Sequence, residues 1–435
     1  MEFDAANIKN NVQNKKCVLL LGASADQLFI IKTAHEIGLE TAVLDGNAAA
    51  PGLKLGTYNA PINFSDLPKV ADFVKQLQNQ GINVCGVTTM GSDVPHLVAK
   101  IAKVFDWVGP SEETGRIATD KYEMKCRFLE NNIPIPNFSL VNSGSEIINL
   151  WRRWQCSKVI VKPTDRAGSR GVRFLRNEVE AETAFQHALK NSLKGKVQLE
   201  EYIEGLQIST ESILTKERCV TPGFADRVYE GMQMFWPQIM ENGGWVPSIL
   251  NTEMRGKVND LVEKAGRALG IIEGPAKGDV VIHPTKGPMM IEIAARLSGG
   301  DFCESLVPLG TNVNYVEAAL RIAVNETVNF EKLIPQKNLA VANRYFFPPP
   351  GVLEEIVGAE EIEVKPEVAK LKFFYQIGEQ IPIIQNHGQR AGVAVIVSHE
   401  RETTQKIVDE VYEKIKFKIN GRYYSGDPRK YAGSQ

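Results

Sequence analysis

The stretch Gly278–Gly300, GDVVIHPTKGPMMIEIAARLSGG, holds the residues around which we interpret the rest of the chain. Two short apolar runs, Val280–Ile282 and Pro288–Ile293, flank the loop His283–Gly287. Proline and glycine in a short loop between two apolar runs are typical of a turn between strands. The stretch therefore predicts a β-hairpin with a five-residue turn.

Two carboxylates belong to this hairpin. Asp279 stands at the start of the first predicted strand and Glu292 near the end of the second. Because these ends lie side by side in an antiparallel pair, both carboxylates can face one point. Mg²⁺ prefers such oxygen ligands and keeps room for phosphate oxygens. The alternative is a solvated hairpin whose charges only mark strand ends.

An arginine and a pair of glycines follow the second strand. Arg296 can hold a phosphate or a carboxylate with its planar guanidinium group. Gly299 and Gly300 let backbone N–H groups approach a bound anion closely. This combination favours the interpretation of the hairpin as an anion and metal site.

Composition limits the class of protein. The chain has 435 residues, 43% of them hydrophobic and 23% charged, with a formal net charge of −2. The length allows two to four domains, and no Lys/Arg cluster suggests a nucleic-acid partner. The six cysteines form no CxxC pair, and no signal peptide or membrane-spanning apolar run is recognised. We therefore expect a cytoplasmic protein without membrane or nucleic-acid partners.

The N-terminal part alternates strands with helices. Strands are predicted at Cys17–Gly22, Glu40–Leu44 and Val84–Thr89, which indicates an open parallel, Rossmann-like sheet. Residues 1–15 are expected to form an arm or a short leading helix. The turn after the first strand has one glycine rather than GxGxxG, which disfavours a dinucleotide site. We prefer a sheet whose strand ends line a substrate cleft.

A second glycine-containing loop lies in the middle of the chain. The strand Lys158–Pro163 includes Lys162 and leads into Thr164–Val172, which contains small residues and two arginines. Backbone N–H groups and a lysine of this kind can cover a phosphate. The alternative, an exposed hairpin turn, stays open at this point. The loop is no Walker motif, because GxxxxGK[ST] is absent.

The remaining segments are mostly strands. Met232–Trp245 is rich in aromatic residues and glycine, and is either a loop that covers the substrate or a surface crossover with buried aromatics. Asn251–Leu269 is predicted to be an amphipathic helix. The tail after Asp427 is expected to be frayed. Further predicted strands are Val197–Gly205, Ile208–Leu214, Val220–Val228, Asn343–Phe347, Glu361–Val364, Leu371–Tyr375 and Ala391–Val397, and further helices lie at Asn314–Val324 and Glu400–Lys414.

A set of these features resembles the ATP-grasp superfamily: Lys121, the Lys162 strand with its glycine loop, the Glu200–Gly205 strand, Asp279, Glu292 and Arg296. The similarity extends over nearly the whole chain. It is closest to the L-amino-acid ligase group, because IEIAARLSGG looks like that group's E-x-x-x-R-x-x-G-G, and biotin carboxylase is a related enzyme. The segment Trp245–Ser248 also looks like the group's x-x-P-S.

The resemblance implies a mixed α/β and α+β architecture. Residues 1–112 would form a Rossmann-like pre-ATP-grasp domain and residues 113–328 a two-lobed ATP-grasp domain that binds the nucleotide between its lobes. Residues 329–435 would form a β-rich C-terminal domain. A homodimer is left open.

The resemblance also assigns roles to particular residues. Lys121 and Lys162 would hold the phosphates of ATP, and Asp279 and Glu292 would bind Mg²⁺, with Mn²⁺ as the alternative. Lys162 and Arg296 would be the catalytic residues. The cofactor-binding set would be completed by the loop residues Gly168, Ser169 and Gly171, by Glu200, by the adenine-binding backbone of Glu201, Tyr202 and Ile203, and by Gln207.

Two positions depart from the family pattern. Ala294 replaces the asparagine that commonly helps to hold metal, and Gln207 replaces an acidic residue that often binds ribose. The implied reaction joins a small amino-acid-like carboxylate to an amine through an acyl phosphate, releasing ADP and phosphate. The alternatives are a bicarbonate-dependent carboxylase of the same fold and, from another class, an NAD-dependent dehydrogenase. The sequence does not identify the acid or the amine.

Overall fold

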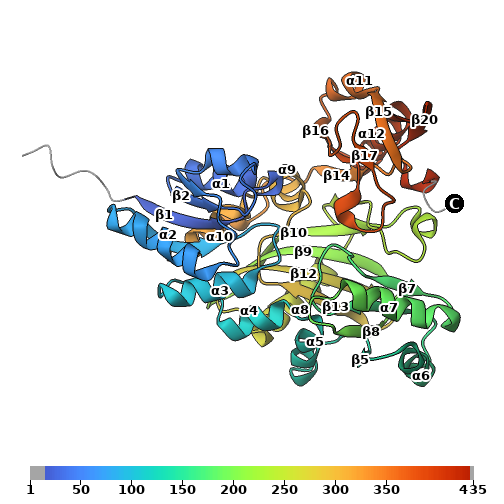
Figure 1. Ribbon diagram of the computed structural model, residues 1–435, viewed down its shortest axis with the longest axis horizontal. Coiled ribbons are helices and arrows are strands. Elements are labelled where there is room, and N and C mark those ends of the chain that lie inside the picture. The colour runs from blue at the N-terminus through green and yellow to red at the C-terminus, as the bar shows by residue number, and fades with distance from the viewer. Residues whose placement is uncertain (1–14, 432–435) are drawn as a thin grey trace, which may run out of the picture.

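The structure is a computed structural model that describes residues 15–431. Among these residues the larger strand groups form four sheets, and Figure 1 shows the N-terminal sheet and the C-terminal strands above the same large sheet. Of the arm predicted for residues 1–15, only Lys15 belongs to the described residues.

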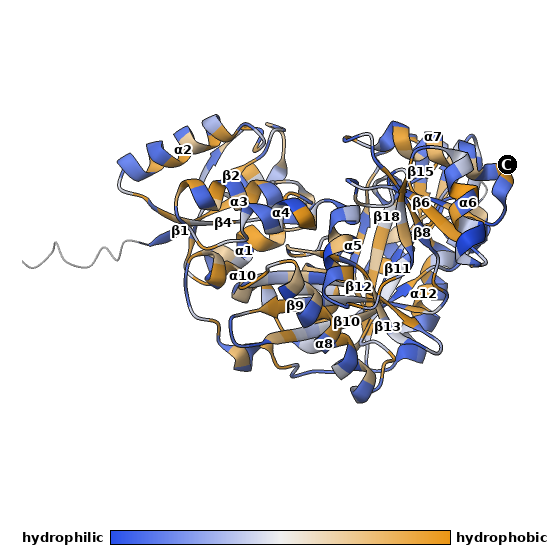
Figure 2. Ribbon diagram, turned by 90° about the horizontal axis from the view of Figure 1, so that it is seen from below, coloured by the Kyte–Doolittle hydropathy of each residue, from blue (hydrophilic) through white to orange (hydrophobic). Residues whose placement is uncertain are grey.

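The N-terminal sheet is parallel, with the strand order β3-β2-β1-β4, which confirms the predicted open α/β sheet. The strand β3 is not predicted from the sequence, because its three residues carry too short a pattern. Figure 2 shows that α2 alternates hydrophilic and hydrophobic residues, as expected for a helix with one face on a sheet. The elements are β1 (Lys16–Leu21), α1 (Leu28–Glu36), β2 (Glu40–Leu44), β3 (Tyr58–Ala60), α2 (Leu67–Asn79), β4 (Asn83–Thr88) and α3 (Pro95–Val104).

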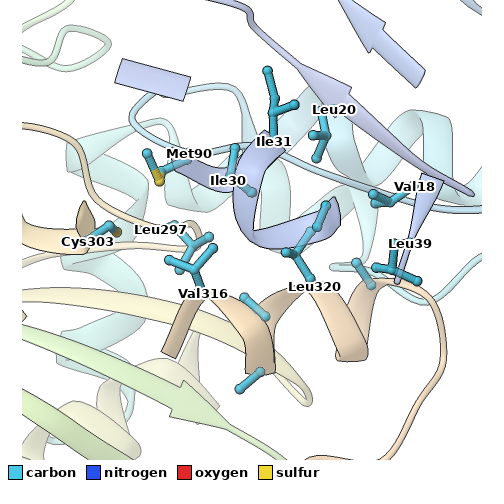
Figure 3. Packing of buried hydrophobic residues seen from close by; sticks show 14 of the residues in the cluster. Val18, Leu20, Ile30, Ile31, Leu39, Met90, Leu297, Cys303, Val316 and Leu320 are labelled. Atoms are coloured by element: carbon cyan, nitrogen blue, oxygen red, sulfur yellow. The ribbon is translucent and has the colours of Figure 1, made fainter. Parts of the chain in front are cut away.

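A helix from much later in the chain closes the core of this sheet. In Figure 3 the buried Val316 and Leu320 of α10 (Tyr315–Ala323) face Ile30 of α1 and the apolar side chains of β1. The approach is close at Gly86 of β4, where a Cβ atom would overlap the carbonyl oxygen of Ala323. The N-terminal sheet is therefore packed against the segment that follows the hairpin.

A smaller antiparallel sheet has the strand order β5-β8-β6-β7. It carries the strand with Lys162 and the following loop, which were both predicted to contact phosphate. Its apolar face is covered by two helices through Ile147, Trp151 and Phe185. The loop between β6 and β7 is the predicted lid. The elements are α4 (Glu112–Ala118), α5 (Lys121–Glu130), β5 (Phe138–Val141), α6 (Gly144–Trp154), β6 (Val159–Pro163), β7 (Arg173–Leu175), α7 (Ala181–Asn191) and β8 (Val197–Glu201).

The largest sheet has eight strands in the order β13-β12-β9-β10-β11-β14-β18-β16. It joins the strands of the hairpin to strands near the C-terminus, because β11 pairs with β14. Helix α8 packs on it through Val258, Leu261 and Val262. The elements are β9 (Leu206–Leu214), β10 (Cys219–Val228), β11 (Gly243–Val246), α8 (Thr252–Ala268), β12 (Gly274–His283), β13 (Gly287–Ala294), α9 (Val307–Thr311), β14 (Ala340–Tyr345), β16 (Val368–Phe373) and β18 (Gly392–Ser398).

The hairpin β12–β13 is present, with Asp279 directly opposite Glu292. Two details differ from the prediction. Asp279 lies inside β12 rather than at its start, because the strand reaches back to Gly274 through residues such as Pro275 and Lys277 that give no strand signal. The turn has three residues, 284–286, rather than five. His283 and Gly287 pair with each other and so belong to the strands.

The last sheet has the order β17-β15-β19-β20 and is built from β15 (Gly351–Val357), β17 (Gln380–Ile381), β19 (Lys416–Ile419) and β20 (Arg422–Ser425), beside α12 (Arg401–Lys414). The strand predicted at Glu361–Val364 is wrong. That segment overlaps the helix α11 (Ala359–Glu363), which starts after Gly358 with two glutamates in its first turn.

The prediction of a frayed tail after Asp427 is also wrong for the residues described. Pro428–Lys430 form a 3₁₀ turn, and Tyr431 is buried with its ring stacked on Phe235, the ring centroids 4.5 Å apart. Buried Tyr431 and the ion pairs of Arg429 with Asp427 and Asp409 hold this segment, and such scattered residues are a weak sequence signal.

We predict that Gly86→Ala lowers the free energy of unfolding by about 3 kcal/mol, because the added methyl group must displace backbone rather than a flexible side chain. Urea unfolding followed by circular dichroism measures the change. The matched control is Gly256→Ala in α8, where nothing lies within 4 Å and helix propensity should add about 0.5–1 kcal/mol. Equal stability of the two variants would contradict the prediction.

Candidate active site

A cavity of about 620 Å³ lies where the sheets meet, and nearly all predicted site residues line it. The end of the N-terminal sheet contributes Ala25, Asp26 and Gly91, as expected for strand ends at a substrate cleft. Gly171 is the exception among the predicted residues, because it packs against Pro163 and Asn191. The predicted residues in the lining are Lys121, Lys162, Gly168, Ser169, Glu200, Glu201, Tyr202, Ile203, Gln207, Asp279, Glu292 and Arg296.

The two hairpin acids are held by cations and a hydroxyl. Ser209 of β9 donates a hydrogen bond of 2.8 Å to Oδ1 of Asp279, and Nη1 of Arg227 lies 3.2 Å from the same oxygen. Lys277 is paired with Oδ2 of Asp279. Lys121, the first residue of α5, forms an ion pair of 2.9 Å with Glu292.

These neighbours decide the charge of both acids. Burial opposes ionisation of Asp279, but Lys277 and Arg227 outweigh it and hold the pKa of this carboxyl well below its usual range. Burial also opposes ionisation of Glu292, and Lys121 outweighs it and lowers the pKa. Two ionised carboxylates therefore face the cavity from adjacent strands.

The donor set fits a magnesium ion that is shared with a ligand. Within residues 15–431 no group of three or more His, Cys, Asp or Glu side chains is placed to hold a metal ion. Two ionised carboxylates alone are too few for a protein-only cage, but they suit Mg²⁺, which usually binds one or two carboxylates together with phosphates and water.

A second ion cluster surrounds Glu200 on β8. Its Oε2 atom lies 2.9 Å from Nζ of Lys162 and 3.5 Å from Nζ of Lys125. Burial lowers the pKa of Lys125 to about 8, while the two lysines outweigh burial and lower the pKa of Glu200. Lys125 was missed in the sequence analysis, although it follows Lys121 by one helical turn and so shares its face of α5.

The loop between β6 and β7 is docked on a segment near the C-terminus. The backbone N–H of His387 donates to the carbonyl of Gly168 at 3.2 Å, and the hydroxyl of Ser169 lies 3.2 Å from Nε2 of the same histidine. Both loop residues have positive φ values, 64° and 60°. The turn is therefore docked on another part of the chain, although Gly168 and Arg170 are exposed.

The predicted adenine segment offers fewer backbone donors than expected. The N–H of Glu201 donates to Asn137 at 2.9 Å and that of Tyr202 to Lys158 at 3.1 Å. In the part of the chain that the structure describes, the N–H of Ile203 has no hydrogen-bond partner. Gln207 accepts a hydrogen bond of 2.9 Å from the hydroxyl of Tyr229.

The segment Met232–Trp245 fits the second of its two interpretations, a crossover with buried aromatics. Phe235 and Trp245 are buried in apolar clusters and do not line the cavity, and only Ile239 and Glu241 of this segment line it. Aromatic and cationic side chains of the C-terminal strands and loops line the cavity instead, and the sequence analysis missed them: Tyr345, Lys372, Phe374, His387 and Arg390.

The turn after β13 joins the N-terminal sheet to the hairpin. Nη1 of Arg296 donates to the carbonyl of Leu297 at 3.1 Å, and Nε lies 3.6 Å from Asp93. The N–H of Gly91 donates to the same carbonyl at 3.1 Å, beside a parallel bridge between Met90 and Leu297. The predicted position of Arg296 at the cavity thus depends on the end of β4.

A buried polar network contacts the turn after β13 at Ser298. The hydroxyl of Tyr315 donates to Oε2 of Glu211 at 2.7 Å and lies 2.8 Å from the sulfur of Cys303. The thiol of Cys303 donates to the carbonyl of Ser298 at 3.1 Å. Burial raises the pKa of Glu211 to about 7.

Comparison with known proteins agrees with this geometry. Residues 118–300 match the ATP-grasp domain family. This chain carries an ATP-grasp domain. Residues 344–420 match L-amino acid ligase C-terminal domain 2. The predicted ATP-grasp fold and the resemblance to ATP-grasp ligases are therefore confirmed at the level of the family.

Individual relatives are similar at low identity. Phosphoribosylamine–glycine ligase of Methanothermobacter thermautotrophicus is 23% identical over 399 residues, 86% of this chain and 87% of the relative. An L-amino acid ligase structure from Bacillus licheniformis has a TM-score of 0.79 and 20% identity, covering 93% of this chain and 98% of that one. A biotin carboxylase from Campylobacter jejuni has a TM-score of 0.69 and 16% identity, covering 92% and 91%. These structural likenesses show the fold.

Within residues 15–431 no helix is both long and apolar enough to cross a membrane.

We predict that Glu211→Gln changes how the stability of the ATP-grasp chain depends on pH. The folded pKa of about 7 lies above the ordinary value of 4.5, so this group stabilises the wild type fully below pH 4.5 and loses that contribution as pH rises to 7. The variant lacks this loss. Relative to wild type it should gain about 3 kcal/mol between pH 4.5 and pH 8, measured by urea unfolding.

The exposed Glu331→Gln is the matched control and should follow the wild type at every pH. A constant difference between wild type and Glu211→Gln across this range would contradict the raised pKa.

Proposed function

We propose that the protein is an ATP-dependent carboxylate–amine ligase that forms an amide or peptide bond through an acyl phosphate and releases ADP and phosphate. The observation that carries the proposal is the pairing of Asp279 and Glu292 across β12 and β13, in one cavity with Lys121, Lys162 and Arg296. The match to an L-amino acid ligase C-terminal domain supports amino-acid-like substrates.

In this proposal the cavity binds ATP between the small sheet and the hairpin. Lys121 and Lys162 would contact its phosphates, and Ile203 would offer its unpaired N–H to the adenine. Asp279 and Glu292 would hold Mg²⁺, with Mn²⁺ as the alternative, and the metal would neutralise phosphate charge. Lys162 is already charge-paired with Glu200, so its ammonium group is positioned before the nucleotide binds.

The reaction follows from this arrangement. A substrate carboxylate attacks the γ-phosphate of ATP and forms an acyl phosphate with release of ADP. Lys121, Lys162 and Arg296 stabilise the charge on the transferring group by fixed electrostatic contacts. An amine then attacks the acyl carbon, and phosphate leaves. The loop with Gly168 and Ser169 would exclude water from the acyl phosphate while it waits for the amine.

Three charged side chains in the lining support a zwitterionic substrate. Within the described residues, Asp26, Lys372 and Arg390 each lack an ion-pair partner, although all three line the cavity. Asp26 lies by the turn with Gly299, since a Cβ atom there would be 4.0 Å from Oδ2 of Asp26. Arg390 stacks on Tyr345, whose hydroxyl donates to the carbonyl of Gly300 at 3.0 Å. An acid and two cations in the lining of one cavity suit a molecule with an ammonium and a carboxylate group.

The second candidate is bicarbonate-dependent carboxylation, which the likeness to biotin carboxylase supports. The dehydrogenase alternative has less support. A dinucleotide site needs a glycine-rich turn after the first strand, but the turn after β1 has one glycine, Gly22, and the side chain of Gln27 lies close to it. Six free cysteines are consistent with action in the reducing cytoplasm, which we retain as part of the proposal.

Trapping the acyl phosphate tests the function. With ATP, MgCl₂ and hydroxylamine, at least one of the twenty standard amino acids should give a hydroxamate, because hydroxylamine replaces the natural amine. Adding a second amino acid should then give a dipeptide and ADP in equal amounts, detected by mass spectrometry. ATP hydrolysis that needs bicarbonate and no amine would favour the carboxylase instead.

We predict that Glu292→Gln lowers turnover about 100-fold or more, because one ionised oxygen ligand at the phosphates is lost. A coupled assay of ADP release measures the rate. Glu331→Gln is the control and should keep the wild-type rate. Wild-type turnover by Glu292→Gln with unchanged thermal stability would exclude the assigned role.

We predict that Lys162→Met weakens ATP binding about 10- to 100-fold, since a charged hydrogen bond contributes about 1.5–3 kcal/mol. Isothermal titration calorimetry with ATP and Mg²⁺ measures the affinity. Lys286→Met, in the exposed hairpin turn, should bind ATP as the wild type does. Equal affinities of the two variants would show that Lys162 serves only the ion pair with Glu200.

A further inference from the structure

The loop between β6 and β7 meets a histidine from the far end of the chain. His387 belongs to a 3₁₀ turn, His387–Gln389, between β17 and β18. Its backbone donates to Gly168 and its Nε2 atom lies 3.2 Å from the hydroxyl of Ser169. One residue thus makes both a backbone and a side-chain contact to the loop.

The same imidazole also contacts the other wall of the cavity. The N–H of Glu241 donates to Nε2 of His387 at 3.4 Å. Arg390 contacts both residues, because Nε donates to the carbonyl of His387 at 2.8 Å and Nη1 to that of Glu241 at 3.4 Å. The position of Glu241 therefore depends on the 387–390 turn.

Glu241 in turn holds an arginine beside the metal acid. Nε of Arg227 donates to Oε2 of Glu241 at 2.6 Å, and Nη1 of Arg227 lies 3.2 Å from Oδ1 of Asp279. A continuous series of contacts therefore runs from the loop through His387, Glu241 and Arg227 to Asp279. Each step is a hydrogen bond or an ion pair, and the step from His387 to Glu241 goes through the backbone N–H of Glu241.

The protonation state of the imidazole suits this position. Burial lowers the pKa of His387 well below its ordinary value, and Arg390, Arg227 and Lys277 add to the effect while Asp279 opposes it. The neutral ring carries its proton on Nδ1 when Nε2 accepts, so the donors of Ser169 and Glu241 share the single lone pair of Nε2.

We propose that His387 is a positioning residue that couples closure of the Gly168–Ser169 loop to the placement of Arg227, and through it of Asp279. Closure over the nucleotide and alignment of the metal acid would then be one event, completed by the C-terminal part of the chain. The inference rests on the proposed function only where ligase kinetics are measured. Closure of the loop is measured separately, with a nucleotide and Mg²⁺ and without the substrates of the ligase.

Hydrogen exchange tests the closure. In the wild type, residues 167–171 should gain protection when a non-hydrolysable ATP analogue and Mg²⁺ are added. His387→Ala should lose most of this gain, and His387→Gln should recover part of it, since the glutamine side chain offers an oxygen acceptor. His399→Ala, an exposed histidine, is the control and should behave as the wild type.

Kinetics test the coupling to Asp279. His387→Ala should lower kcat at least tenfold with less than a threefold change in KM for ATP, because Lys121 and Lys162 still bind the phosphates. Ser169→Ala, on the surface of the loop and unable to disturb the core, should lower kcat in the same direction. The double variant should lose no more than His387→Ala alone, since both remove the same contact.

The outcomes separate the two proposals. Protection that depends on His387 in a protein without ligase activity would leave the coupling intact and overturn the function. Ligase activity with wild-type protection and kcat in His387→Ala would overturn the coupling and leave the function intact. Additive losses in the double variant would also overturn the coupling.

Discussion

Two like charges placed directly opposite each other on adjacent strands impose the main constraint on this fold. Asp279 and Glu292 face each other across β12 and β13, and such a pair is destabilising unless cations are near. Lys277 comes from the same strand as Asp279, Arg227 from β10 and Lys121 from the start of α5. Cations from the hairpin itself and from two further elements, β10 and α5, therefore keep both acids ionised in a half-buried position.

The same hairpin connects the remote parts of the chain. The turn after β13 pairs with Met90 at the end of the N-terminal sheet, and the segment that follows becomes α10, whose Val316 and Leu320 complete the core under β1 and α1 (Figure 3). The N-terminal sheet thus depends on residues more than two hundred positions later for part of its apolar core. This packing fixes the N-terminal sheet relative to the hairpin, so the segments that follow its strands line the cavity.

Local pattern and spacing were enough to predict much of this arrangement. The hairpin, Lys162, Arg296 and the N-terminal strands each carry a signal within about ten residues. Gly171 does not line the cavity, and the sequence does not distinguish a glycine that packs tightly from one that faces a ligand. Arg227 and His387 were not predicted, since each acts through an ion pair or hydrogen bond to a distant part of the chain, and such contacts leave no local pattern. Lys125 did have a local signal, its spacing of one helical turn from Lys121.

The eight-stranded sheet has a mechanical consequence. Because β11 of the central region is hydrogen-bonded to β14 of the C-terminal region, the two cannot be separated without exposing an unpaired strand edge. Both strands are buried along their length, and an apolar edge of this kind is a template for intermolecular pairing. A chain truncated before residue 340 should therefore aggregate rather than persist as a smaller soluble catalyst. The C-terminal strands belong to the scaffold of the enzyme and are not a detachable module.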